Sequence, residues 1–357
     1  MKRRNVLAGA GLAAVTPFSL PAPAIAKSAR RLTMVTDWPE GPGVLPSARR
    51  FAQIVDDASG GGIRIEVTSS GEVVRPFETF DAVQSGVADM FHSHIGYFDG
   101  KSPAFHLYSG VPFGFTANEM FAWVRFGGGQ ALWDELCGQF NVKPLLCSST
   151  GAQMGGWFRN ELTSTEELKG LRYRMAEPGA EVFRRLGATV VVLPGADIVQ
   201  SLRSGAIDAC EWLGPWLDTR MGLHEVAGFY YYPAWHEPGT ALALGINRRL
   251  WDSLDDSERR IIETAAASEY TVSLAEFNAN NAAALRRLQD DGTVQIRRFD
   301  DAILKAFAEI SADVVAEAGA GDDLSRRIYR SYFDFLAMIR EWSDISEGAY
   351  LDIRRFS

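Results

Sequence analysis

The 357-residue sequence is poor in the residues from which catalytic and metal centres are usually built. It has three cysteines and five histidines, and it contains no Cys-x-x-Cys or His-x-x-x-His pair, no Walker loop and no Gly-x-Ser-x-Gly elbow. An enzyme would therefore have to use scattered carboxylates. The composition is otherwise globular, with 46% hydrophobic and 23% charged residues, and the length suits two domains.

Long hydrophobic runs are also missing, since no segment reaches the ~20 apolar residues that a membrane-spanning helix needs. The chain begins with a basic segment, a short apolar stretch and the small-x-small pattern Ala24-Ile25-Ala26. We interpret residues 1–26 as a cleaved export signal, and the pair Arg3-Arg4 suggests the twin-arginine route as an alternative to general export. No cysteine follows Ala26 to carry a lipid, so the mature protein is expected free in the periplasm.

Positive charge is scarce in the mature chain. Removing the signal leaves 33 basic against 45 acidic residues and shifts the net charge from -9 to -12, which argues against a nucleic-acid partner. Cys137, Cys147 and Cys210 make an odd count for an oxidising compartment, and none has metal-site spacing. A bridge between Cys137 and Cys147 is one reading, and buried free thiols are the favoured one.

Strands and helices alternate along most of the chain, which predicts a largely parallel α/β sheet. Strands are expected at 32–36, 63–67, 171–175 and 189–193, and helices at 46–58, 76–85, 179–186 and 197–204. The pattern Ser164-x-x-Glu167 is a plausible capping box before the second group. Later segments read as helices at 255–290, 301–318 and 323–342, the first of them long enough to span two lobes.

One segment occurs twice. Residues 82–99 (AVQSGVADMFHSHIGYFD) align without gaps with residues 201–218 (SLRSGAIDACEWLGPWLD), unless the similarity is accidental. The alignment pairs Ser85 with Ser204, Gly86 with Gly205, Asp89 with Asp208, Tyr97 with Trp216 and Asp99 with Asp218. It predicts two lobes of like topology, with His92-Ser93-His94 and Glu211-Trp212-Leu213 just beyond the carboxyl ends of equivalent strands. Ligands of open α/β sheets bind there, so two facing lobes would form a cleft.

Several residues suggest chemistry, and each has a purely structural alternative. Arg172 and Arg174 alternate on one strand face, where a guanidinium either holds a carboxylate or pairs internally with Glu177 or Glu181. His92 and His94 would share a strand face, as a metal pair would require, although ordinary hydrogen-bonded roles are favoured. The segment FYYYPAWHEPG (229–239) is either a rigid hydrophobic corner or part of a site, and Glu237 favours the site.

An aromatic face with interleaved arginines marks the last predicted helix. Its members are Tyr329, Tyr332, Phe333, Phe335, Leu336 and Ile339. They either pack on the body of the chain or meet a partner helix.

Four motifs carry a resemblance to a known family. They are TGAQMGGWFRNEL (150–162), LKGLRYRMAEPGAEVFRRLGA (168–188), SGAIDACEWLGPWLD (204–218) and YYYPAWHEPG (230–239). In these motifs the chain resembles the extracytoplasmic solute receptors of TRAP (tripartite ATP-independent periplasmic) transporters, in the dicarboxylate-receptor family, and most closely the branch that binds 2-oxo acids. The likeness covers nearly the whole mature chain.

The resemblance implies a two-lobed α/β periplasmic binding protein with a central cleft, a long lobe-spanning helix and C-terminal helices. It implies lobe I at 27–151 and about 240–270, lobe II at 152–239 and about 271–320, and a candidate dimerisation helix at 321–357. Delivery of a 2-oxo or 2-hydroxy monocarboxylate to TRAP permease subunits would be its function, with no organic cofactor. The alternative from another class is an exported hydrolase or lyase that uses Glu211 and Glu237 as acid and base.

The same resemblance implies the binding residues. Arg174 would hold the carboxylate, and Na⁺ or Ca²⁺ would be bound by Gln153, Glu211 and the Trp212 carbonyl, with Glu237 close by. The other ligand contacts implied are His92, Ser93, His94, Tyr97, Trp216 and, as a weaker candidate, Asn247. Ala176-Glu177-Pro178 departs from the family's glycine-rich stretch, so a second carboxylate is expected beside Arg174. A cation would explain how Glu211 can be buried, since an unpaired buried carboxylate costs several kcal/mol.

Overall fold

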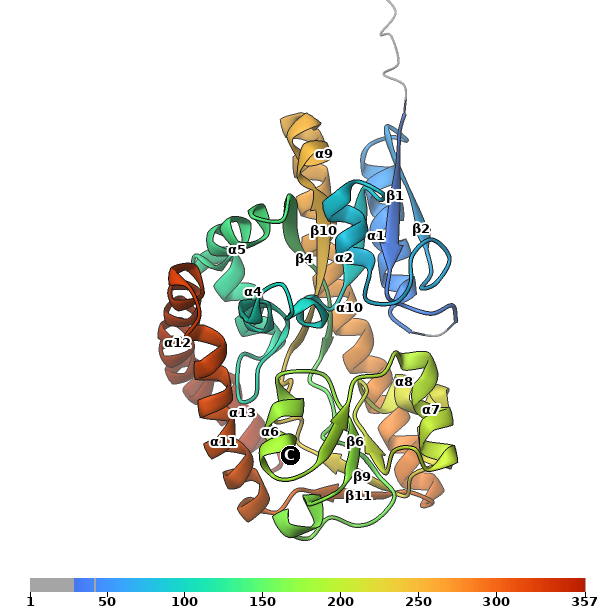
Figure 1. Ribbon diagram of the computed structural model, residues 1–357, viewed down its shortest axis with the longest axis vertical. Helices are drawn as coiled ribbons and strands as arrows, with labels where there is room; N and C mark the ends of the chain where they lie inside the picture. The colour runs from blue at the N-terminus through green and yellow to red at the C-terminus, as the bar shows by residue number, and fades with distance from the viewer. Residues whose placement is uncertain (1–28, 42, 357) are drawn as a thin grey trace, which may run out of the picture.

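The computed structural model describes residues 29–41 and 43–356, so the export signal predicted at 1–26 lies outside the described residues. Two β-sheets lie at opposite ends of the long axis, and helices cover both (Figure 1). We call the sheet that contains the N-terminal strands, with its helices, the first lobe, and the other the second lobe. No helix in the described part of the chain combines the length and apolarity needed to cross a membrane.

The sheet of the first lobe has the strand order β2-β1-β3-β10-β4. Its strands are β1 (Arg30–Thr36), β2 (Ile63–Thr68), β3 (Met90–Ser93), β4 (Val142–Gly151) and β10 (Thr240–Asn247). The first three are parallel, and β10 runs antiparallel to both β3 and β4. Because β10 is reversed, its first residue lies at the same edge of the sheet as the carboxyl end of β3.

The sheet of the second lobe has the order β11-β9-β5-β8-β6-β7. Its strands are β5 (Gly156–Phe158), β6 (Arg172–Arg174), β7 (Thr189–Val191), β8 (Ala209–Cys210), β9 (Phe229–Tyr232) and β11 (Gln295–Arg298). Here β6, β7 and β8 are parallel, and β5 is antiparallel to β8. The parallel trio followed by a reversed strand repeats the arrangement of the first lobe, which confirms two lobes of like topology.

Helices flank the sheets and join the lobes. Those beside the first sheet are α1 (Leu45–Ala58), α2 (Thr79–Ser85), α3 (His106–Ser109), α4 (Ala117–Phe126), α5 (Gly129–Gly138) and α9 (Arg248–Ser253). The second lobe carries α6 (Gly179–Arg185), α7 (Gly195–Ser204) and α8 (Pro215–Met221), and α11 (Asp301–Gly319), α12 (Asp323–Ser343) and α13 (Ala349–Arg354) end the chain. Most predicted elements are present, and the Ser164–Glu167 capping box is confirmed.

Helix α10 (Asp256–Asp291) is the long helix that the sequence predicted. Asp255 and Glu258 form a capping box at its start, and Gly292 ends it in the left-handed conformation. It contacts α1 and β4 of the first lobe and α8 of the second. The chain also crosses between the sheets from β4 to β5 and from β9 to β10. The residues at which one lobe passes into the other stay a prediction.

The buried core settles two alternatives left open by the sequence. Cys137, Cys147 and Cys210 are free and buried, as favoured. One face of α12 packs on the body of the chain: Tyr332 is fully buried, its ring lies 4.0 Å from that of Phe115, and its hydroxyl accepts the Phe115 N–H at 2.9 Å. The aromatic face of α12 therefore belongs largely to the chain's own core.

Candidate functional site

A small cavity lies where the two lobes meet. The space between its walls, counted together with the solvent at its mouth, is about 370 Å³. Its polar lining consists of the half-buried Tyr97 and of six buried residues, His94, Gln153, Arg174, Glu211, Glu237 and Thr240. They come from the loop after β3, the two crossing segments and the ends of β6 and β8, so the fold gathers them from both lobes.

Arg174 is the last residue of β6 and is 1% exposed. Its Nη1 donates to the Glu211 backbone carbonyl at 3.0 Å and to the Glu211 carboxylate, and its Nε and Nη2 donate to the Leu193 carbonyl. Its guanidinium also lies 5.2 Å from the Trp212 ring centroid, a cation–π contact. The pairing with Glu177 or Glu181 is therefore wrong for Arg174.

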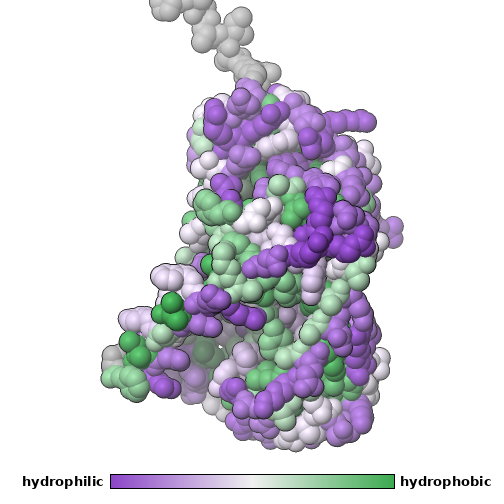
Figure 2. Space-filling model, turned by 90° about the vertical axis from the view of Figure 1, so that its left-hand side faces the viewer, coloured by the Kyte–Doolittle hydropathy of each residue, from purple (hydrophilic) through white to green (hydrophobic). Residues whose placement is uncertain are grey.

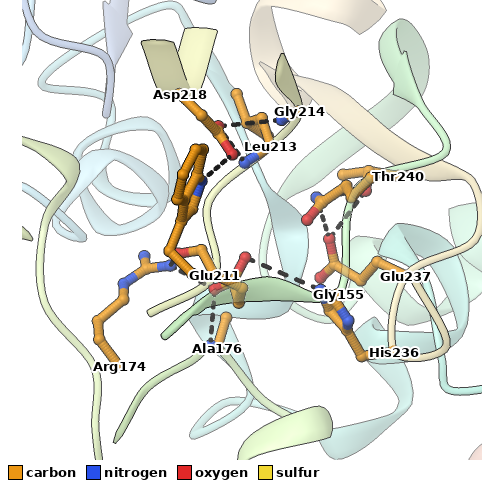
Figure 3. Close-up of polar contacts among 12 residues, drawn as sticks. Gly155, Arg174, Ala176, Glu211, Leu213, Gly214, Asp218, His236, Glu237 and Thr240 are labelled. Atoms are coloured by element: carbon orange, nitrogen blue, oxygen red, sulfur yellow. Dashed lines mark hydrogen bonds and ion pairs between the residues drawn. The ribbon is translucent and has the colours of Figure 1, made fainter. Parts of the chain in front are cut away.

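Glu211 follows β8 directly, and its backbone N–H donates to the Arg174 carbonyl at 3.1 Å. One carboxylate oxygen, Oε1, faces Arg174 and the Ala176 N–H, while Oε2 lies 3.9 Å from His236 Nε2 (Figure 3). Burial raises the pKa of Glu211 to about 8 against the attraction of Arg174. A single guanidinium is therefore a weak counter-charge for this carboxylate.

The crossing segments supply the other side of the cavity. Gly151 ends β4 with a φ of +70°, which favours glycine, and the turn that follows places Gln153. The Gln153 amide donates at 2.6 Å to both Glu237 and Thr240, and the Thr240 hydroxyl donates at 2.8 Å to Glu237. Burial would raise the pKa of Glu237, but nearby His94, at 3.2 Å, and its other partners lower it to about 2.

A hard cation suits this group of oxygens. Because the Gln153 nitrogen is bonded to Glu237 and Thr240, its buried Oε1 atom is left without a hydrogen-bond partner. Carboxylate and amide oxygens are the ligands that Na⁺ and Ca²⁺ prefer. Within 29–41 and 43–356, no three His, Cys, Asp or Glu side chains are grouped to hold a metal, so a cation here would also need amide, carbonyl or ligand oxygens.

The loop residues after β3 divide between cavity and core. His94 and Tyr97 line the cavity, whereas His92 and Ser93 do not. Both His92 ring nitrogens are bonded, to Trp38 and Ser148, and the Ser93 hydroxyl donates to Asp37. The favoured interpretation of His92 as an ordinary hydrogen-bonded residue is confirmed, and the alternative of a His92/His94 metal pair is wrong, because His92 has no free nitrogen.

Of three further residues predicted to contact the ligand, one lines the cavity and two lie elsewhere. Trp212 lines the cavity, and α7 begins with Gly195 because a Cβ there would come within 2.5 Å of the Trp212 ring. Trp216 packs edge-on against Phe277 of α10 instead. Asn247 caps α9 at the far end of β10, seven residues from cavity-lining Thr240, so the reversed strand carries it to the opposite edge.

The predicted second carboxylate beside Arg174 is not available. Glu177 forms an ion pair with Arg184 and accepts the Glu181 N–H at 3.2 Å. It lines an adjoining recess that shares Tyr97 and Ala176 with the cavity. The Glu177 carboxylate is therefore paired with Arg184 of α6, and the expectation that it lies beside Arg174 is wrong.

Sequence reasoning missed the apolar part of the cavity. These residues are Trp38, Val44, Ala176, Leu213 and Leu242. It also missed Asp218, which accepts the Leu213 and Gly214 N–H groups, the Trp157 indole N–H and the Tyr230 hydroxyl at 2.7–3.1 Å (Figure 3). Asp218 therefore stabilises the turn after Glu211. The repeat alignment had paired Asp218 with Asp99 but had given it no role.

Comparison with known proteins gives consistent results. Residues 34–322 match the model of the bacterial extracellular solute-binding protein family 7. The chain is 36% identical over 357 residues, 98% of each protein, to a monocarboxylate 2-oxoacid-binding periplasmic protein of Nostoc sp..

Two solved structures are similar throughout. One is a TRAP periplasmic solute-binding protein from Pseudoalteromonas atlantica with bound sodium and pyruvate, at TM-score 0.87 and 32% identity over 91% of this chain and 99% of that one. The other, from Bordetella bronchiseptica, is a mixed-occupancy dimer with calcium and picolinate, at TM-score 0.88 and 30% identity over 92% and 98%. The fold, the periplasmic class and the family expected from the four motifs are thus confirmed: the chain belongs to the family 7 extracellular solute-binding proteins, the receptors of TRAP transporters.

Proposed function

We propose that this receptor binds a small monocarboxylate with an oxygen on carbon 2, a 2-oxo or 2-hydroxy acid, together with Na⁺ or Ca²⁺, and delivers it to a TRAP membrane permease. The observation that carries the proposal is the buried Arg174–Glu211 pair in the cavity between the lobes, beside the unpartnered oxygen of Gln153. The relatives that hold pyruvate with sodium and picolinate with calcium support it.

The charges of the cavity explain why a cation would be needed. Burial raises the pKa of Glu211 to about 8, so the carboxyl is ionised near pH 7 only when a cation contacts it. Arg174 then contributes one positive charge, and Glu211 and Glu237 contribute two negative ones, leaving the histidines aside. A bound carboxylate would add a third negative charge and would share Arg174 with Glu211. Buried charges without partners cost several kcal/mol, so a cation that contacts both the acid and Glu211 restores the balance. An acid with two carboxylates would add a further negative charge, so the charges of the cavity disfavour it.

The geometry of the cavity and the family resemblance support the following roles for the individual residues. Arg174 would hold the carboxylate, since guanidinium matches it in shape and charge. Glu211, the Gln153 oxygen and the Trp212 backbone carbonyl would bind the cation, and Glu237 would fix the Gln153 amide so that its oxygen points inward. Tyr97 and His94 would close the cavity from the first lobe.

Closure would couple binding to shape. The cavity is lined from both lobes, so a ligand inside it stabilises the closed arrangement over any form in which the lobes separate. The permease would then recognise the closed receptor.

We infer that the protein performs no covalent chemistry. The pKa values of Glu211 and Glu237 are shifted in opposite directions, as in an acid and base pair. However, Glu211 is paired with Arg174, and Glu237 accepts two hydrogen bonds, so both carboxylates already have structural partners. The family is one of solute receptors, and nothing in the comparisons favours the hydrolase or lyase alternative.

The C-terminal end supports self-association. Beyond the packed part of α12, apolar side chains are more than half exposed, namely Met338, Trp342, Ile345, Tyr350, Leu351, Ile353 and Phe356. Figure 2 shows hydrophobic residues on a projection beside the body of the molecule. We propose that this tail contacts a second copy, in line with the dimeric Bordetella bronchiseptica relative.

Calorimetry and thermal unfolding with pyruvate and Ca²⁺ test the proposal. A ligand at 100 times its dissociation constant stabilises the wild type by about 2.7 kcal/mol. Arg174→Ala should remove this ligand-induced gain, and Glu211→Gln should remove the part that depends on the cation.

Arg172→Ala is the matched control. Arg172 lies two residues away on the same strand but outside the cavity, paired with Asp208. It should keep the ligand response. Equal responses in Arg174→Ala and wild type, or turnover of the acid, would contradict the proposal.

A further inference from the structure

The polar groups of the cavity account for the head of the ligand but not for its tail. Besides His94, Thr240 and Tyr97, whose hydroxyl is engaged by Arg174, the lining from the first lobe consists of three apolar residues. They are Trp38 and Val44, which follow β1, and Leu242 of β10, and we call these three the wall. All three are less than 5% exposed and belong to one hydrophobic cluster that also contains Leu217 of the second lobe. A carboxylate at Arg174 and a carbon-2 oxygen at the cation leave the tail against this wall.

Trp38 is the only residue of the wall with a side-chain polar atom, and that atom is engaged elsewhere. Its indole N–H donates to Nδ1 of His92 at 2.8 Å, in a fully buried contact. An indole has one donor and no acceptor, so the bonded ring has no polar group left for a ligand. The wall is apolar because of His92, a residue that lies outside the cavity.

The His92 ring is held in place by a second hydrogen bond, on the side away from Trp38. Because Trp38 can only donate, Nδ1 must accept, and the other ring nitrogen donates to the Ser148 hydroxyl at 2.8 Å. Ser148 lies 2.6 Å from the Ser47 hydroxyl, which donates to buried Glu269 of α10.

The chain of hydrogen bonds ends at a charge pair. Arg50 donates to both oxygens of Glu269 at 2.7 Å. Each group of this hydrogen-bonded chain therefore donates toward Glu269. Burial lowers the pKa of His92 to about 3, so its ring stays neutral near pH 7. The indole of Trp38 is held by a network that reaches the lobe-spanning helix.

Resting on the function proposed above, we propose that Trp38, Val44 and Leu242 select acids with a short apolar tail, and that His92 is the positioning residue that keeps this wall free of hydrogen-bond donors. A hydroxyl or carboxylate on the tail would be buried there without a partner. By the cost of an unsatisfied polar group, such acids should bind about 5- to 100-fold more weakly than their alkyl counterparts.

The test uses two acids of nearly equal size, 2-oxobutanoate and 3-hydroxypyruvate, which differ by a methyl and a hydroxyl group. Calorimetry with saturating Ca²⁺ should show that the wild type prefers 2-oxobutanoate about 5- to 100-fold. His92→Leu frees the indole N–H, and the preference should fall below about threefold. In His92→Asn, the amide oxygen replaces Nδ1 as acceptor and should retain the preference.

Two further measurements distinguish a positioning role of His92 from a general loss of structure in the variants. Trp38→Phe has no donor at all and should keep the preference for the alkyl acid. The indole N–H resonance of Trp38, identified by its absence in Trp38→Phe, should shift in His92→Leu and stay near its wild-type position in His92→Asn.

The outcomes distinguish the two proposals. Equal binding of both acids by the wild type, or a wild-type preference in His92→Leu with a shifted indole resonance, overturns the inference alone. Failure of both acids to bind to the wild type overturns the proposed function instead.

Discussion

The two copies of the internal repeat begin alike and end differently. In the first, Asp89 accepts the Thr33 N–H at 2.8 Å and returns a hydrogen bond from its own N–H. In the second, Asp208 does the same with Arg172, at 3.1 Å. Both follow a left-handed glycine, at Gly86 and Gly205 respectively. Both copies therefore begin the strand with the same pair of hydrogen bonds between an aspartate and the neighbouring strand.

Beyond the strand the copies diverge. His92 and Ser93 turn to internal partners, whereas Glu211, at the place of His92, faces Arg174 in the cavity. Asp218 is buried with four donors, whereas its counterpart Asp99 is 42% exposed in its side chain. The difference teaches that the common fold specifies which edge of each sheet carries the site, while the residues after the strand decide its charge.

The largest effect is expected from breaking the Asp218 turn. In Asp218→Asn an amide N–H₂ replaces one carboxylate oxygen and faces either the two backbone N–H groups or the Trp157 indole, which can only donate. At least one hydrogen bond therefore fails and the others lose their charged acceptor, at about 1–3 kcal/mol each. Urea unfolding should show a loss of several kcal/mol. Asp99→Asn, the equivalent change in the first copy, should stay within about 0.5 kcal/mol. Similar losses in both would mean that the copies do not differ as described.

A smaller effect is expected where the copies agree. Hydrogen bonds from Arg172 lower the pKa of Asp208, so this carboxylate stabilises the fold above its ordinary pKa, and the gain is lost as the pH falls through the lowered value. Asp208→Asn should cost about 1 kcal/mol at pH 7 and progressively less toward pH 3.

Asp89→Asn is the control for this change. Within the described part of the chain, the Asp89 carboxylate accepts from the backbone N–H and the hydroxyl of Thr33 and from no arginine. A pH-independent loss in Asp208→Asn, measured by unfolding across pH 3–7, would contradict the role given to Arg172.

The smallest effect on the fold itself is expected where the comparison ends, at the C-terminal tail, which has no counterpart in either copy. Deleting residues 344–357 removes exposed side chains and leaves the packed part of α12 in place. The free energy of unfolding of the monomer should change by less than about 0.5 kcal/mol, whereas sedimentation should show that the dimer is lost. A dimer that persists would place self-association on another surface.

Local sequence patterns predict much of this architecture. Alternating strands and helices, the capping box at Ser164 and the long helix after Asp255 depend on neighbours in sequence. The capping box and the long helix were predicted to within a residue, and the ends of the other predicted elements to within about three residues. The repeat indicated the site's edge, and the family resemblance drew attention to Arg174, Gln153 and Glu237, which the fold brings together in one cavity.

The misplaced residues share a physical reason. Position along a strand indicates the edge of the sheet, but not which neighbouring segment covers a side chain there. His92 was therefore expected in the cavity, although Trp38 covers it. Asn247 was expected there too, but strand reversal in β10 takes it to the other edge. Trp38 and Thr240 escaped notice because their roles arise from contacts far apart in sequence.

The two crossing segments between the sheets give the cavity a further property. Gln153 lies between β4 and β5, and Glu237 lies between β9 and β10, and the two are hydrogen-bonded to each other. Any rotation of one lobe against the other must change backbone torsions in these connections. A ligand bound as proposed would act at the connections about which the lobes rotate, so its presence would fix the angle between the outer surfaces of the two lobes.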